Sequence, residues 1–141
     1  MAADRGFHTF DHTADIGLAS WGPDFAAALA EAAMGLQSLI VSEGEIRDRR
    51  RRTFAVTAGD PAALVVAWLN ELIFAFDVDQ LVFARFEVHT TSDRSLEALA
   101  VGEPFDSDRH RLGTGIKAAT YHELNVRLGD DRAELRVILD L

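Results

Sequence analysis

The alternation of apolar and polar residues predicts two strands and then a helix in the first part of the chain. Phe7–Phe10 and Ile16–Trp21 both alternate with the period of a strand. After them, Gly22-Pro23-Asp24 predicts a helix start with Asp24 as the cap. Apolar residues then recur with helical spacing at positions 25, 29, 33, 36 and 40. We expect this helix to end at Gly44.

A second helix and four strands are predicted in the remainder. Asp60-Pro61 repeats the start pattern, and Ala62–Phe76 is apolar on nearly every side. Such a helix must be buried all round, so we expect a sheet to wrap it or partners to cover two of its sides. Alternation with period two then predicts four antiparallel strands, with a turn at Gly129-Asp130 between the last two. These strands are Leu81–His89, Ser95–Val101, Ile116–Leu128 and Ala133–Leu139.

Length and composition predict one soluble domain over residues 1–141. A chain of 141 residues with 48% hydrophobic residues is long enough for one core and short for two. The absence of cysteine excludes disulfides, thiolate metal sites and cysteine nucleophiles, which leaves oxygen and imidazole ligands. Met1–Gly6 has no basic stretch followed by an apolar run, and no segment approaches 18 consecutive apolar residues. We therefore expect a cytoplasmic protein with no membrane contact.

The charge balance argues against direct binding of a polyanion. The chain has 14 basic and 23 acidic residues and a formal net charge of -9, whereas tight nucleic-acid binding requires neutralisation of phosphates. If RNA is involved, we expect another protein to hold it. Arg49–Arg52 is a local exception that is best interpreted as a solvated loop or an edge strand leading into Phe54–Thr57. A local contact with RNA or with an acidic partner stays open.

Asp11-His12-Thr13-Ala14-Asp15, between the first two strands, is the first candidate for chemistry. Its two carboxylates and imidazole could bind a hard cation such as calcium or magnesium. The same residue types also form turns closed by hydrogen bonds from the side chains to the backbone. Spacing alone does not separate these two interpretations.

Lys117 is the second candidate, because it is the only lysine beside thirteen arginines. Its retention favours a position where a compact ammonium is needed, although one residue can escape a compositional bias by chance. Alternation predicts two faces for this strand. One carries Lys117, Ala119 and Tyr121, and the other carries Ala118, Thr120 and His122.

The third candidate is Asp140, beside the terminal carboxylate of Leu141. Two carboxyl groups at a strand end repel each other unless a cation offsets their charge. The alternative is that both groups face water at a frayed end. Elsewhere the sequence lacks a Ser/His nucleophile pair, a glycine-rich phosphate loop and a His-Glu-x-x-His helix, so a catalytic function is not favoured.

Five segments together resemble the archease family, and the resemblance runs nearly end to end. It implies an α+β fold, a single archease-like domain in which an antiparallel β-sheet curves around two α-helices. The segments are Asp11–Asp15, Trp68–Leu72, Gly102–Asp106 with His110, Lys117–His122 and Leu139–Leu141.

The resemblance also implies a function without catalysis of its own. Archeases are accessory proteins of the GTP-dependent RtcB-type RNA ligase, which joins an RNA 3′-phosphate or cyclic phosphate to a 5′-hydroxyl. They promote guanylylation of the ligase, so that it turns over repeatedly in tRNA splicing and RNA repair. On this resemblance the ligase is the partner, RNA is contacted only through the ligase, and no small-molecule substrate is expected.

The family's functional residues fall on both ends of the chain. The resemblance implies a divalent metal, usually calcium, bound by Asp15, Asp140 and Leu141, and it implies that Lys117 acts with Asp15 and Asp140 on the ligase. Asp11, His12 and His122 would support this site from nearby. The departures are Ala119 in place of the usual Val or Ile, Leu141 in place of Ile, and the Arg49–Arg52 run.

Two other functions remain open at this point. The first is a metal-dependent phosphoester hydrolase, in which a cation on Asp15 and Asp140 activates water and His12 or His122 acts as the base. The second is a chaperone-like module that binds several proteins through exposed aromatic residues, because the chain contains nine phenylalanines.

Overall fold

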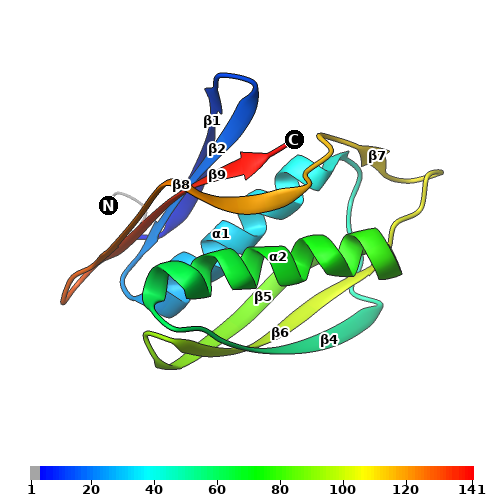
Figure 1. Ribbon diagram of the computed structural model, residues 1–141. Helices are drawn as coiled ribbons and strands as arrows, with labels where there is room; N and C mark the ends of the chain where they lie inside the picture. The colour runs from blue at the N-terminus through cyan, green and yellow to red at the C-terminus, as the bar shows by residue number, and fades with distance from the viewer. Residues whose placement is uncertain (1–3) are drawn as a thin grey trace.

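A computed structural model describes residues 4–141 and contains two helices and nine strands within that range (Figure 1). The helices are α1 (Phe25–Ile40) and α2 (Pro61–Asp79). The strands are β1 (Gly6–His12), β2 (Asp15–Gly22), β3 (Val41–Glu43), β4 (Arg50–Thr57), β5 (Leu81–Ser92), β6 (Ser95–Pro104), β7 (Arg111–Leu112), β8 (Ala118–Leu128) and β9 (Ala133–Asp140).

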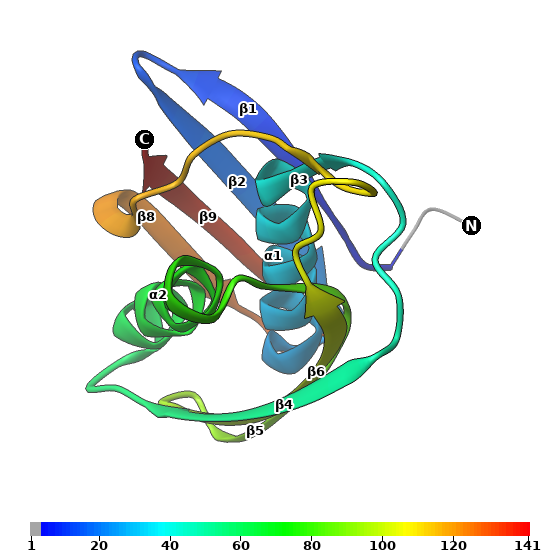
Figure 2. The ribbon, with the colours of Figure 1, turned by 90° about the vertical axis from the view of Figure 1, so that its right-hand side faces the viewer.

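The strands form three antiparallel sheets. Four strands pair in the order β1-β2-β9-β8, three in the order β4-β6-β5, and β3 pairs with β7. Figure 2 shows the two larger sheets on opposite sides of a layer made by α1 and α2. The predicted α+β class, with antiparallel strands and two helices, is confirmed. The helices are enclosed by separate sheets, because the four-stranded and three-stranded sheets share no paired strand.

Both predicted helix caps are confirmed. Asp24 accepts a hydrogen bond from the Ala27 N–H at 2.8 Å, and Asp60 accepts one from the Ala63 N–H at 2.7 Å. The predicted end of α1 at Gly44 is wrong, because the helix ends at Ile40. Val41–Glu43 pairs with the distant β7, and a partner so far along the chain leaves no trace in local periodicity. Both short strands were missed for that reason.

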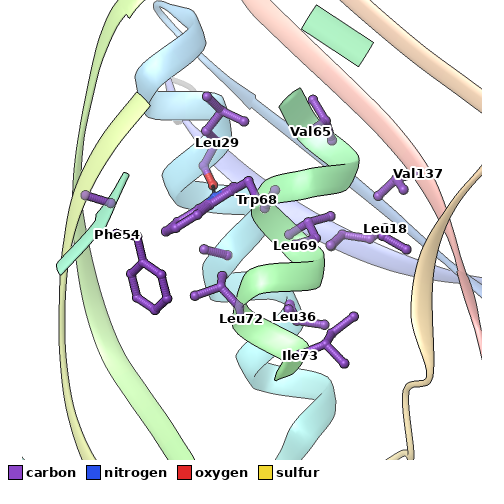
Figure 3. Close-up of a cluster of buried hydrophobic side chains, with 14 of the residues drawn as sticks. Leu18, Leu29, Leu36, Phe54, Val65, Trp68, Leu69, Leu72, Ile73 and Val137 are labelled. Carbon is purple, nitrogen blue, oxygen red and sulfur yellow. Dashed lines mark hydrogen bonds between the residues drawn. The ribbon is translucent and has the colours of Figure 1, made fainter. Parts of the chain in front are cut away.

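The centre of the core is formed by α2, packed against α1 and both larger sheets (Figure 3). Trp68 is fully buried and its indole N–H donates to the Leu29 carbonyl of α1 at 3.0 Å. The expectation that two sides of α2 are covered is confirmed. The expectation that it is buried all round is wrong, because Phe74 and Val78 are 57% and 59% exposed. By length and apolar composition alone, α2 could cross a membrane. Helices buried in the core of a protein meet the same two criteria.

The predicted Ile116–Leu128 strand exists as β8, but it is interrupted. Thr120 pairs with Ile138 and Asn125 pairs with Arg136, so four residues of β8 lie opposite the single residue Val137 of β9. We call Tyr121–Leu124 the β8 bulge. The predicted period-two alternation is wrong beyond Thr120, because extra residues in one strand break the alternation of faces.

The arginine run leads into an edge strand, one of the two interpretations given for it. Arg50 is the first residue of β4, which lies at the edge of the three-stranded sheet. Arg52 donates to the Asp79 carboxylate at 2.6 Å, and its guanidinium lies 5.7 Å from the Phe54 ring centroid. Charged residues on an edge strand hinder its pairing with other chains.

Candidate functional site

Strand register brings the first and last predicted metal ligands together. β1 pairs with β2 as far as His12 and Asp15, and β2 pairs with β9 as far as Ile16 and Leu139. Continued by one residue beyond the Ile16–Leu139 pair, the same register puts Asp15 opposite Asp140. Figure 1 shows the β1–β2 turn and the end of β9 at the same end of the sheet.

The two aspartates share one face of the four-stranded sheet. Leu139 is fully buried toward the helices, and its neighbours in sequence point the other way because side chains alternate along a strand. We call the face that points away from the helices the outer face. Asp15 and Asp140 lie on it together with His12, since laterally paired residues point to the same side. The same alternation places Asp11 on the helix-facing side, away from this group.

Lys117 and Leu141 lie next to Asp140 along the backbone. The Lys117 N–H donates to the Asp140 carbonyl at 2.8 Å, immediately before Ala118 pairs with Asp140. Lys117 is exposed, and it lines a groove with Leu141 and with Phe76 of α2. The groove lies toward the helices, so the Lys117 side chain and the two carboxylates approach the sheet end from different sides.

Asn70 holds this end of β8 against α2. Its Oδ1 accepts a hydrogen bond from the Ala119 N–H at 2.8 Å. The role of Asn70 could not be predicted from the sequence, in which the only indication is a polar side chain inside an otherwise apolar helix. Asn70 therefore positions the segment that carries Lys117.

The donor set at the sheet end suits a hard divalent cation. Asp15 and Asp140 would offer carboxylate oxygens to such an ion, and Leu141 would offer a main-chain oxygen. Across residues 4–141, neither carboxylate forms an ion pair with a basic side chain. Two neighbouring carboxylates without a protein counter-charge fit the binding of a cation.

A second group of possible ligands lies on the outer face. Glu123 of the β8 bulge contacts the His12 Nε2 through its Oε2, which also lies 3.6 Å from the His122 Nε2. The two imidazole rings meet edge to face with their centroids 5.6 Å apart. The structure thus brings His12 and His122 together and adds Glu123. The sequence does not indicate Glu123, because unbroken alternation places it on the face opposite His122.

The buried acid Glu103 belongs to a structural network. It is 1% exposed and accepts hydrogen bonds from the Arg47 N–H at 2.7 Å and from the Arg109 guanidinium, while His110 Nε2 lies 3.0 Å away. Burial by itself raises the pKa of Glu103, but these hydrogen bonds and the charge of Arg109 lower it to about 2. The network fastens the segment between β6 and β7, so Glu103 and His110 support the fold.

The fold and the site define a small α+β protein with two helices between antiparallel sheets and with oxygen and imidazole donors gathered at one sheet end. The Archease protein family matches residues 7–141, and the chain belongs to this family. The predicted resemblance is thereby confirmed.

Individual relatives agree with this assignment. The archease of Methanosarcina acetivorans is 30% identical over 141 residues, which cover 97% of each chain. The archease of Methanopyrus kandleri is 32% identical over 134 residues, with 93% of this chain and 96% of that protein covered. The solution structure of a Methanobacterium thermoautotrophicum protein is 31% identical, with a TM-score of 0.74 and coverage of 96% and 99%.

A more distant structure supports the fold alone. The crystal structure of a Thermotoga maritima protein, titled an archease and possible chaperone, is 19% identical and has a TM-score of 0.60. It covers 94% of this chain and 94% of its own.

Proposed function

We propose that this protein is a non-catalytic, cytoplasmic activator of a GTP-dependent RtcB-type RNA ligase, and that it promotes guanylylation of the ligase and hence multiple turnover in tRNA splicing and RNA repair. The observation that carries the proposal is the strand register that aligns Asp15 with Asp140 at one sheet end, in a chain of the archease family. The Lys117 backbone lies next to Asp140 there, and the Lys117 side chain lies on the helix-facing side of the same end. With a net charge of -9, the protein would contact RNA only through the ligase.

A divalent cation, calcium in our proposal, would be held by the Asp15 and Asp140 carboxylates and the Leu141 main-chain oxygen. Bound there, it would supply positive charge to an acidic surface. The oxygen donors match the preference of calcium, which takes carboxylate and carbonyl ligands in flexible geometry.

The Lys117 ammonium would act on the ligase beside this cation. An activator changes the state of its partner only by binding one conformation more tightly than another. We propose that the sheet end docks at the mouth of the ligase active site and favours the conformation that accepts guanylate. Loss of Lys117 or of either aspartate would then remove activation and leave the fold intact.

Formation of ligase guanylate from labelled GTP, followed by multiple-turnover RNA joining, tests this proposal. Asp15→Asn, Asp140→Asn and Lys117→Met are each expected to lose about tenfold or more of the stimulation, equivalent to about 1.4 kcal/mol of coupling. Asp131→Asn is the matched control, because Asp131 is an exposed aspartate in the β8–β9 turn at the opposite end of the same sheet. Full stimulation by all three site variants would end the proposal.

A chaperone-like module is the second candidate, and the exposed Phe74 and Val78 of α2 favour it. They lie four residues apart on one helix face, and the Thermotoga relative is titled a possible chaperone. Capture from the native cell separates the candidates, because an activator recovers one ligase and a chaperone recovers many unrelated proteins. Phosphoester cleavage by the purified protein with added metal and no ligase would instead indicate a hydrolase.

A further inference from the structure

The group formed by His12, His122 and Glu123 has the composition of a metal site that differs from the oxygen site. We call it the imidazole cluster. Two neutral imidazoles and one carboxylate form a donor set that zinc uses in proteins, whereas calcium prefers oxygen ligands alone. The chain contains no cysteine and therefore no thiolate, the soft ligand that zinc also accepts. Imidazole is the ligand in this chain that best suits zinc.

The fold builds this cluster from the two opposite edges of one sheet. His12 ends β1, and His122 and Glu123 belong to the β8 bulge, with β2 and β9 between these strands. The bulge is therefore what lets residues of β8 reach a residue of β1. Glu123 also has a backbone φ of 51°, in the left-handed region that a non-glycine residue seldom occupies. Bulges and such backbone conformations are concentrated at functional sites.

The spacing of the donors is close to what a tetrahedral ion requires. One donor atom from each residue lies within 4.8 Å of the other two. Zinc bound at about 2.0–2.1 Å holds neighbouring tetrahedral ligands about 3.3 Å apart. His122 Nε2 and Glu123 Oε2 are 3.6 Å apart, close to this spacing, and His12 and Glu123 would need to separate to admit an ion.

The cluster can be reached from solvent and is not saturated by protein contacts. The side chains of His122 and Glu123 are 66% and 52% exposed, so an ion has an entry path and room for a water ligand. His12 is only 22% exposed, and its Nδ1 is buried without a hydrogen-bond partner among residues 4–141. Buried polar atoms are normally satisfied, but Nδ1 is not the nitrogen that faces Glu123, so this unpaired atom does not by itself indicate an ion at Nε2.

We propose that His12, His122 and Glu123 bind a zinc-class divalent cation with an open position for water, as a second metal centre beside the oxygen site. The ion joins the two edge strands β1 and β8 across the outer face of the sheet and orders the β8 bulge. This assignment does not depend on activation of a ligase.

Zinc titration of the untagged protein by calorimetry tests the assignment. One zinc per chain is expected, and His12→Asn, His122→Asn and Glu123→Gln are each expected to weaken binding about tenfold or more. His89→Asn is the matched control, because His89 is an exposed histidine on β5 outside the cluster. Asp15→Asn is expected to bind zinc like the wild type and to lose calcium binding.

Two further readouts make the result decisive. Cobalt in place of zinc is expected to give an intense visible spectrum in the wild type and His89→Asn, and to lose it in His12→Asn and His122→Asn. Circular dichroism of every variant shows whether the fold is retained. Zinc binding that is equally strong in a folded His12→Asn/His122→Asn double variant overturns the proposal, as does zinc binding that is lost only with Asp15 or Asp140. The titration contains no ligase, so its failure is distinct from a failure of the proposed activator function.

Discussion

Replacement of Glu103 by glutamine is expected to destabilise the protein in a pH-dependent way. Glutamine keeps the size of the side chain but removes the charge that faces Arg109, and it offers one acceptor oxygen where the carboxylate offers two, one to the Arg47 N–H and one to Arg109. The carboxyl is 1% exposed, so solvent cannot replace these interactions. Removing one partner of a buried ion pair leaves the other charge without compensation.

The magnitude follows from the pKa of Glu103, which is about 2 in the folded protein against an ordinary value of 4.5. Each pKa unit is equivalent to about 1.4 kcal/mol, so the ionised carboxylate stabilises the fold by about 3 kcal/mol at neutral pH. Because the folded-state pKa is the lower one, this stabilisation is complete above pH 4.5 and is lost as the pH falls toward 2. At pH 3 about two fifths of it remains.

Chemical denaturation of the wild type and Glu103→Gln between pH 7 and pH 3 measures this effect. The difference in unfolding free energy is expected to be about 3 kcal/mol at pH 7 and to shrink toward pH 3. Glu87→Gln is the control, because Glu87 forms an exposed ion pair with Arg85 at 3.3 Å that is worth less than about 1 kcal/mol. A difference that stays constant across this pH range would refute the role assigned to the charge.

Two further substitutions test the packing of the core. Trp68→Phe removes the hydrogen bond to the Leu29 carbonyl and some buried volume, so it is expected to cost about 1–3 kcal/mol in equilibrium unfolding, and an unchanged midpoint would contradict the packing described. Gly102→Ala places a methyl group 1.9 Å from the Val82 carbonyl oxygen and is expected to cost about 3 kcal/mol or more. Gly59→Ala meets no atom within 4 Å and should be within about 0.5 kcal/mol of the wild type; equal costs for the two glycine variants would contradict the close approach of β5 and β6.

Most of the correct predictions about the fold depended on residues that are close together in the chain. The caps Asp24 and Asp60 were identified correctly because a cap bonds to a backbone N–H three residues away. The six longest strands other than β4, and both helices, followed from periodicity, which depends only on which side of an element is buried. The end of α1 and the short strands β3 and β7 escaped, because pairing between distant segments decides them.

In the candidate site too, the sequence indicates the residue types, and the pairing of distant strands decides which residues lie together. The residue types at Asp15, Lys117 and Asp140 were recognised from the sequence and from resemblance to a family, and the lack of cysteine restricted the possible ligands. Their proximity was implied only by the resemblance to a family, because no local pattern at either end of the chain indicates it. It depends on β9 pairing with β2 in one particular register, and a slip of one residue would turn Asp140 toward the core.

The sequence by itself therefore determined the types of the main elements, the helix starts and the chemical nature of the available ligands. Only the tertiary structure decided that β8 bulges after Thr120 and carries Glu123 to His12. The physical reason is the distance along the chain over which each interaction acts. Periodicity and capping are set by hydrogen bonds and burial within a few residues, whereas strand register and bulges are set by the packing of a whole sheet against the core.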